Sequence, residues 1–458
     1  MTSESPMLPW RPGRDWLAAL FLVAGCATPT VGALPPATPA PIAETALVPA
    51  PVPPPTPEPP PDLLPEPVEL SPLEAPQLAP PVAEGPVRVA LLLPLSGPAE
   101  ALGRSFLDAA TLALFEVGGD RLVLMPRDTQ GTAEFARAAA ESALQEGAEL
   151  ILGPVFSPAV AAAADAARAR RVSMVAFSTD TTIAGDGVFL LSFLQQQQVD
   201  RVVRYATLQG HRRYAALAPE TPYGIAVVES LRVSADDTGG ALVNIQLYAA
   251  VEPDMMGTVE RLADYELRRN RLAAERRSLV AQGDQAGLAR LEGLDTLGGP
   301  GFDAVMLADS GSELRQLAPL LPFFDVDPDD VPFVGTGLWD DPTRGQESAL
   351  VGAWVAAPPP QAAAQFYERF TSVWGYRPLR IATLAYDAVA LVAALSRGTV
   401  LDFTRAAIAN PHGFAGTDGI FRFLSSGVVD RGLAVMEVEA DGLAVIDPAP
   451  SMFQQVIN

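Results

Sequence analysis

Hydroxyl and aromatic side chains recur where predicted β-strands end in the first part of the folded region. In open α/β sheets, ligands bind at the carboxyl ends of strands, where helix N-termini also offer free N–H groups. Hydroxyls and N–H donors suit a carboxylate, and aromatic rings suit the apolar remainder of a ligand. We therefore expect a small amino-acid-like ligand in a cleft at this edge. The residues are Ser96, Phe156, Ser157, Phe177, Ser178 and Thr179.

A second group of side chains stands at equivalent positions later in the chain. Tyr223 and Asp309 follow predicted strands, and Trp339 follows another. Asp309 suits the ammonium group of a ligand, and Trp339 could wall the cleft. A structural interpretation stays open for several of these residues, because Ser, Thr and Asp at helix starts are frequently N-caps. Phe156 and Phe177 could equally belong to the core.

Catalytic motifs are missing from the sequence. His211 and His412 lie far apart and lack the spacing of a zinc-binding helix. There is no Gly-x-Ser-x-Gly elbow and no Gly-x-Gly-x-x-Gly fingerprint, and a phosphate loop is excluded because the chain has no Lys. We expect no enzymatic activity, no cofactor and no metal site. The net charge of -23 also argues against a nucleic-acid partner.

The single cysteine, Cys26, ends a segment typical of protein export. Arg11 and Arg14 precede an apolar run over 16–25, which is too short to span a bilayer. The run ends in Leu-Val-Ala-Gly-Cys, which resembles a bacterial lipobox and implies a signal peptide over 1–26 with lipid attached at Cys26. The alternative is an ordinary cleaved signal. Residue 27 is not Asp, which by the same resemblance implies an outer-membrane lipoprotein facing the periplasm, in contact with the membrane through its lipid only.

Residues 27–86 form a proline-rich segment with 21 of the 45 prolines of the chain. Prolines cannot continue a helix or donate to a strand ladder, and they favour extended polyproline II structure. We expect a disordered tether with a reach on the order of 150 Å or more.

From residue 87 onward, apolar strands alternate with helical patterns, which predicts parallel sheets covered on both faces. The pattern restarts after residue 208, so we expect two doubly wound α/β lobes around a cleft within one domain over 87–458. The first lobe is expected over about 87–208 and 357–410, and the second over about 209–356 and 411–458. A charged stretch with regularly spaced Leu predicts a helical insertion at about 256–296.

Several motifs resemble those of type I periplasmic binding proteins, the leucine-binding-protein branch. They are Val-Ala-Leu-Leu-Leu-Pro-Leu-Ser-Gly at 89–97, Ile-Leu-Gly-Pro-Val-Phe-Ser at 151–157, Val-Ala-Phe-Ser-Thr at 175–179 and Pro-Tyr-Gly at 222–224. With the lipobox, the insertion and Gly-Thr-Gly-Leu-Trp at 335–339, the chain is most similar to penicillin-binding-protein activator lipoproteins. The resemblance implies a bilobed fold and a peptidoglycan synthase as partner. The tether stands where the best-known activators carry a helical-repeat domain, so contacts made by that domain cannot be transferred.

These observations lead to two alternative hypotheses for the function. The first is a lipid-anchored regulator of peptidoglycan synthesis that docks on a penicillin-binding protein, with the insertion as candidate docking element. The second is a solute receptor for a branched-chain-type amino-acid importer, which the hydroxyl-lined strand ends favour.

Overall fold

The computed structural model describes residues 85–249, 251, 253–339, 348–396 and 402–453, all within one compact unit that spans residues 76–458. The expected signal peptide with Cys26 and nearly all of the expected tether lie outside the described residues. In the described ranges, no helix is long and apolar enough to cross a membrane.

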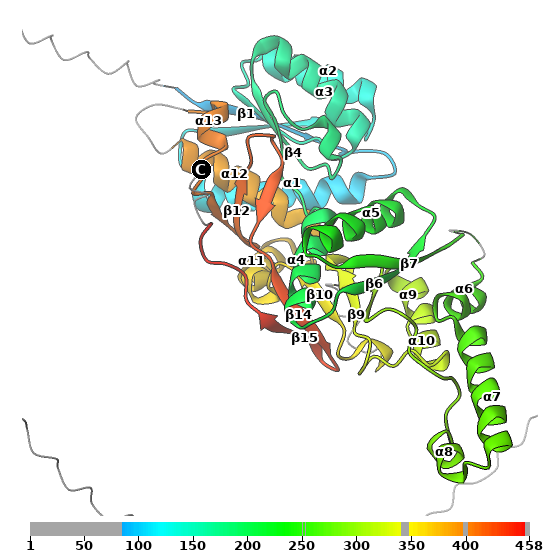
Figure 1. Ribbon diagram of the computed structural model, residues 1–458. Coiled ribbons are helices and arrows are strands. Elements are labelled where there is room, and N and C mark those ends of the chain that lie inside the picture. The colour runs from blue at the N-terminus through cyan, green and yellow to red at the C-terminus, as the bar shows by residue number, and fades with distance from the viewer. Residues whose placement is uncertain (1–84, 250, 252, 340–347, 397–401, 454–458) are drawn as a thin grey trace, which may run out of the picture. The chain divides into compact units, whose positions relative to one another are not determined.

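The first lobe is built on a five-stranded parallel sheet with the strand order β2-β1-β3-β4-β5 (Figure 1). Its strands are β1 (Val87–Leu93), β2 (Leu122–Asp128), β3 (Leu150–Leu152), β4 (Ser173–Ala176) and β5 (Val188–Leu190). Alternate residues of β1 enter two separate apolar clusters, because successive side chains of a strand point to opposite faces. Helices α2 (Ala133–Gln145) and α3 (Ser157–Arg170) cover one face. The other face packs against α1 (Glu100–Val117) and α12 (Thr383–Leu395).

The second lobe contains a seven-stranded sheet with the order β15-β14-β10-β9-β8-β6-β7. Its strands are β6 (Arg213–Pro219), β7 (Ala241–Tyr248), β8 (Ala304–Leu307), β9 (Phe333–Thr336), β10 (Trp354–Ala357), β14 (Ala434–Glu439) and β15 (Gly442–Asp447). The first five are parallel, and β14 and β15 return antiparallel. Helices α4 (Gln195–Leu208) and α5 (Pro222–Asp237) cover one face, whereas α6 (Met255–Leu262), α9 (Gly311–Leu317) and α10 (Leu320–Phe323) cover the other. The predicted α/β bilobed class is confirmed.

A small antiparallel sheet and two further helices complete the first lobe. The sheet consists of β11 (Phe414–Gly416), β12 (Gly419–Phe423) and β13 (Val429–Arg431), and the helices are α11 (Ala364–Trp374) and α13 (Arg405–Ile408). Phe421, Phe423 and Val429 join the apolar core that also holds β1 and α12. The expected boundary at residue 411 therefore differs from the structure, in which the chain returns to the second lobe only after β13.

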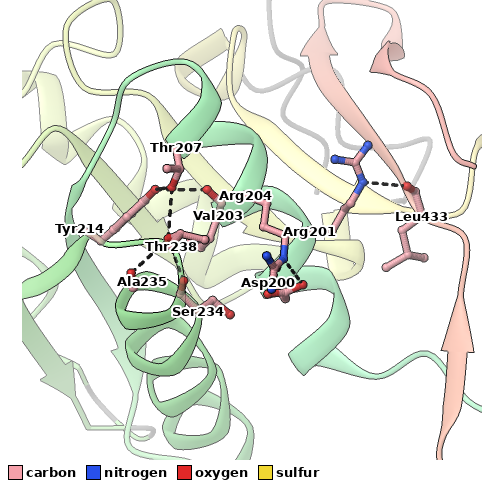
Figure 2. Close-up of polar contacts among 10 residues, drawn as sticks. All are labelled: Asp200, Arg201, Val203, Arg204, Thr207, Tyr214, Ser234, Ala235, Thr238 and Leu433. Atoms are coloured by element: carbon pink, nitrogen blue, oxygen red, sulfur yellow. Dashed lines mark hydrogen bonds and ion pairs between the residues drawn. The ribbon is translucent and has the colours of Figure 1, made fainter. Parts of the chain in front are cut away.

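Helix α4 belongs to the second lobe, although the first lobe was expected to extend to residue 208. Its apolar residues pack with β6, β10 and α5 of the second lobe. The Tyr214 hydroxyl lies 2.9 Å from Thr207 Oγ1 and donates to the Val203 carbonyl at 3.2 Å (Figure 2). Thr207 Oγ1 also contacts Thr238 Oγ1 of the turn after α5 at 3.3 Å. The chain crosses between the lobes before α4 rather than at residue 209, because the buried face of this helix matches the second sheet.

The expected insertion forms three helices, α6, α7 (Tyr265–Gln282) and α8 (Gln285–Arg290). In Figure 1, α7 and α8 extend away from the second sheet. The Arg268 side chain, only 4% exposed, fixes the base of this arm. Its Nε donates to the Gly298 carbonyl at 2.7 Å, and one terminal nitrogen lies 2.9 Å from the Asp325 carboxylate. We call α7 and α8 the arm.

The chain crosses between the lobes three times: before α4, between β10 and α11, and after β13. A cluster of buried charges lies in the first lobe next to these chain crossings. Asp387 of α12, Asp418 of the β11–β12 turn and Arg431 of β13 are each 6% exposed or less. Arg380 lies 2.9 Å from a carboxylate oxygen of Asp418, and the Thr417 N–H donates to Asp387 at 2.6 Å. Burial and the neighbouring Asp418 carboxylate raise the pKa of Asp387 to about 6. Phe193, in the first crossing, has the guanidinium carbons of Arg380 and Arg431 at 4.8 and 4.6 Å from its ring centre.

Arg268→Ala should loosen the base of the arm, because it removes a buried guanidinium from its carboxylate and carbonyl partners. We expect a loss of stability near the low end of the roughly 3–5 kcal/mol typical of a broken buried ion pair, since Asp325 is partly solvated. Limited proteolysis should cut the arm faster in this variant. Arg269→Ala, at an exposed neighbouring position, is the control, and equal cleavage of both variants would contradict the anchor role.

Asp387→Asn should remove part of the pH dependence of stability. The folded chain keeps a proton on Asp387 that the unfolded chain loses between about pH 4 and pH 6, so the free energy of unfolding falls as pH rises through this window. The amide keeps an acceptor for the Thr417 N–H but does not titrate. We expect the fall to shrink by on the order of 3 kcal/mol. Denaturant unfolding at several pH values measures it, and an unchanged profile in the variant would refute this role.

Candidate functional site

Three of the four hydroxyls expected at the strand ends of the first lobe, those of Ser96, Ser157 and Ser178, are bonded within that lobe. Ser96 donates to a carboxylate oxygen of Asp128 at 2.6 Å. Burial would raise the pKa of Asp128, but hydrogen bonds from the Ser96 hydroxyl and from the backbone N–H groups of Gln130 and Leu95 together hold it below its usual value. Ser157 and Ser178 lie 3.0 Å apart, and the Ser178 hydroxyl also accepts from the Asp180 N–H.

The two expected aromatic residues of the first lobe have different surroundings. Phe177 is 4% exposed and packs edge-on against Phe106, with ring centres 5.1 Å apart. It is therefore a core residue, as the structural interpretation allowed. Phe156 is 38% exposed and precedes α3, with its ring against Gly131, where an added Cβ would lie 3.2 Å from it.

Asp309 and Trp339 of the second lobe contact each other. Trp339 is 2% exposed, and its indole N–H donates to the Asp309 carbonyl at 2.9 Å. The ring packs so closely on Gly335 that a side chain at that position has no room. The Asp309 carboxylate accepts from the Tyr248 hydroxyl and, at 2.7 Å, from the Ser310 N–H. This group braces the loops that follow β8 and β9.

A cavity of about 1120 Å³ lies beside the chain crossings. Among the expected site residues, the ones that line it are Thr179 and Tyr223. The remainder of the wall comes from the loop after β4, the first crossing with the start of α4, the start of α5, the loops after β9 and β10, α11, and the connection from α11 to α12. These wall residues include Asp180, Thr181, Thr182, Phe193, Gln195, Gln196, Gln198, Leu338, Pro358, Tyr367, Arg377, Arg380 and Ile381.

The polar groups of the cavity differ between its two sides. The first lobe supplies three threonines, Asp180 and two arginines, whereas the second supplies glutamines of α4 and the Tyr223 hydroxyl. Tyr223 lies 2.6 Å from Thr336 Oγ1, and burial raises its pKa to about 12, so the hydroxyl is neutral at physiological pH. Gln198 accepts from the Gly337 N–H at 3.0 Å, which fixes the loop after β9.

Gln196 lines this cavity and carries an unpaired polar atom. Its side-chain carbonyl oxygen is buried, and within the described residues it has no hydrogen-bond partner. A buried acceptor without a donor costs roughly 1–3 kcal/mol. The cavity thus combines cations, hydroxyls, amides and apolar surface, a set suited to a polar organic molecule.

Sequence reasoning missed the wall contributed by the crossings and by the α11–α12 connection. A run of four glutamines, 195–198, opens a helix that is otherwise amphipathic, and this run was a readable signal. Arg377 and Arg380 follow the left-handed Gly375 that ends α11. Their approach to the cavity depends on the return of a segment nearly two hundred residues downstream, which periodicity does not reveal.

Comparison with known proteins agrees with this architecture. The family model described as periplasmic binding protein matches residues 86–442. A putative branched-chain amino acid ABC transporter protein from Rhodospirillum rubrum is 18% identical, with a TM-score of 0.63, over 79% of this chain and all of that one. The leucine-binding protein LivK from Thermotoga maritima is 19% identical, with a TM-score of 0.52, over 79% of this chain and 98% of that one.

Two further relatives extend this picture. A solute binding protein from Rhodopseudomonas palustris BisB5, solved in complex with 3,4-dihydroxybenzoic acid, is 18% identical, with a TM-score of 0.55, over 80% of this chain and 97% of that one. An uncharacterised protein of Rickettsia prowazekii is 20% identical over 162 residues, which are 35% of this chain and 43% of that protein. Two α/β lobes joined by three crossings, together with the family match over most of the chain, lead to one conclusion: the chain belongs to the periplasmic binding protein family.

Proposed function

We propose that this protein binds a small organic solute in the cavity beside its chain crossings, as a lipid-anchored protein of the cell envelope. The cavity itself carries the proposal, because it joins about 1120 Å³ of space to polar groups from both lobes. Structures solved in complex with 3,4-dihydroxybenzoic acid and with benzoate, and a leucine-binding protein, share the fold. These ligands are carboxylic acids of a size that the cavity admits.

The proposed solute has both a polar and an apolar part. Phe193, Leu338 and Ile381 offer apolar surface, and the glutamines of α4 and Tyr223 add polar groups to the wall. This combination favours amino acids or short peptides over purely aliphatic molecules. A receptor role for an amino-acid importer follows naturally from such a ligand.

Thermal unfolding of the full chain with a panel of candidate solutes tests this proposal. The panel contains amino acids, alanyl dipeptides, benzoate and 3,4-dihydroxybenzoate. A ligand at a hundredfold excess over its dissociation constant should stabilise the chain by about 2.7 kcal/mol. Ala226→Phe, which fills the cavity from α5, should abolish the shift, whereas Val233→Phe on an exposed position of the same helix should keep it. The absence of a shift with every compound would contradict solute binding.

Regulation of a penicillin-binding protein is the second candidate, and the arm favours it. Helix α7 carries five arginines against two glutamates in a chain whose net charge is -23. Arg269, Arg271 and Arg277 are exposed along it. The anchor at Arg268 holds this basic helix away from the second sheet, where it could contact an acidic surface of a synthase. Charge complementarity of this kind acts mainly on association rate and specificity.

Reversal of the exposed charges on α7 tests the second candidate. The triple variant Arg269→Glu, Arg271→Glu and Arg277→Glu should lose binding to a purified penicillin-binding protein and stimulation of its glycan polymerisation. A control triple variant reverses Arg104, Arg170 and Arg171, which are exposed on the first lobe. Equal binding by wild type and both variants, or equal loss in both, would remove the arm as the docking element.

A further inference from the structure

Basic residues outnumber acidic residues among the described residues of the cavity wall, whereas acidic residues outnumber basic ones in the whole chain. The sequence has 54 acidic residues against 31 arginines, yet the cavity wall holds Arg377 and Arg380 with Asp180 as its acid. Asp180 keeps its charge but is held in place, because one carboxylate oxygen accepts from both the N–H and the hydroxyl of Thr182, at 3.1 and 2.6 Å. Among the described lining residues, two cations therefore stand against one anion.

Arg380 is held rigidly at the cavity wall. Its guanidinium lies 2.9 Å from Asp418, whose side chain is completely buried, and it stacks over the Phe193 ring. Arg431 lies on the same ring, at 4.6 Å, and its Nε donates to the Ser192 carbonyl at 2.9 Å. The buried charge cluster thus positions Arg380 and its aromatic support together, so little rotamer entropy remains to be lost on binding.

Arg377 is less constrained and more available. It is an exposed residue whose guanidinium lies over the Tyr367 ring, at 5.1 Å. Within the described residues, it makes no ion pair. Both arginines lie in the segment after the end of α11, with Pro378 between them, and both line the same cavity. An arginine over an aromatic face, without a carboxylate partner, offers its planar donor edge to an anion.

The hydroxyls first expected to bind a carboxylate, Ser96, Ser157 and Ser178, satisfy one another or Asp128 inside the first lobe. We propose that Arg377 and Arg380, from the connection between α11 and α12, form the subsite that binds the carboxylate of the solute. Phe193 and Tyr367 contact the apolar part of the ligand next to that carboxylate. This assignment rests on the proposed solute-binding function, and it specifies that the solute carries a carboxylate.

Paired ligands that differ only in charge test this subsite on the full chain. The probes are leucine and leucinamide, benzoate and benzamide, and alanyl-alanine and its C-terminal amide. Calorimetric titration of wild type should show each bound acid at least about tenfold tighter than its amide, as for a charge-assisted hydrogen bond. Arg377→Gln should weaken the acid roughly ten- to a hundredfold and leave the amide unchanged.

Two controls keep the outcomes distinct. Arg170→Gln removes an exposed arginine of α3 outside the cavity and should bind like wild type. Arg380→Lys keeps a charge beside Asp418 but loses the planar fork, and it should weaken acids while its melting temperature reports folding. Amides that bind as tightly as acids, or an Arg377→Gln variant that binds acids like wild type, would overturn the subsite and leave solute binding intact. No binding by any probe would overturn both proposals.

Discussion

The alignment of the first and third chain crossings is the constraint on which the site depends. Arg431 donates to the Ser192 carbonyl, Gln197 donates to the Val429 carbonyl, and Arg201 donates to the Leu433 carbonyl. Figure 2 shows the last of these bonds, from α4 to the segment that enters β14. Three side chains thus bind two segments that are more than two hundred residues apart in the sequence.

These bonds come with a large desolvation cost, because Arg431 and two carboxylates are buried beside them. A buried ion pair is weak evidence for net stability, so a specific geometry is the better explanation for retaining it. The geometry it maintains is that of Phe193 and Arg380, both of which line the cavity. The buried charges therefore cost desolvation free energy, and they hold Phe193 and Arg380 in the positions that shape the cavity.

The sequence predicted the fold well where strands were long or fully apolar. The alternation expected from residue 87 begins with β1, and the restart expected after residue 208 begins with β6. Helices α6, α7 and α8 lie in the stretch at about 256–296 for which the charged amphipathic pattern predicted helices. Short strands such as β5, β11 and β13, of three residues each, carry too few residues for a period to be visible. The lobe boundaries were less accurate, because an amphipathic helix such as α4 does not state which sheet covers its apolar face.

The lining of the cavity was predictable only in part, and for a physical reason. Strand ends can be counted along a sequence, and this approach selected Thr179 and Tyr223, which line the cavity. It also selected Ser157 and Trp339, whose hydrogen bonds are satisfied locally, because a single sequence does not distinguish a cap or a brace from a ligand contact. The arginines after α11 reach the cavity through tertiary packing, which no local pattern encodes.

Hydrogen exchange of the full chain, with and without a pooled mixture of amino acids, alanyl dipeptides and benzoates, tests the central claim most directly. The claim is that the cavity beside the crossings is the working site of this protein. The account predicts slower exchange in segments 193–198 and 377–381, which supply lining residues from both lobes. Unchanged exchange in both segments, or protection confined to the arm, would contradict it.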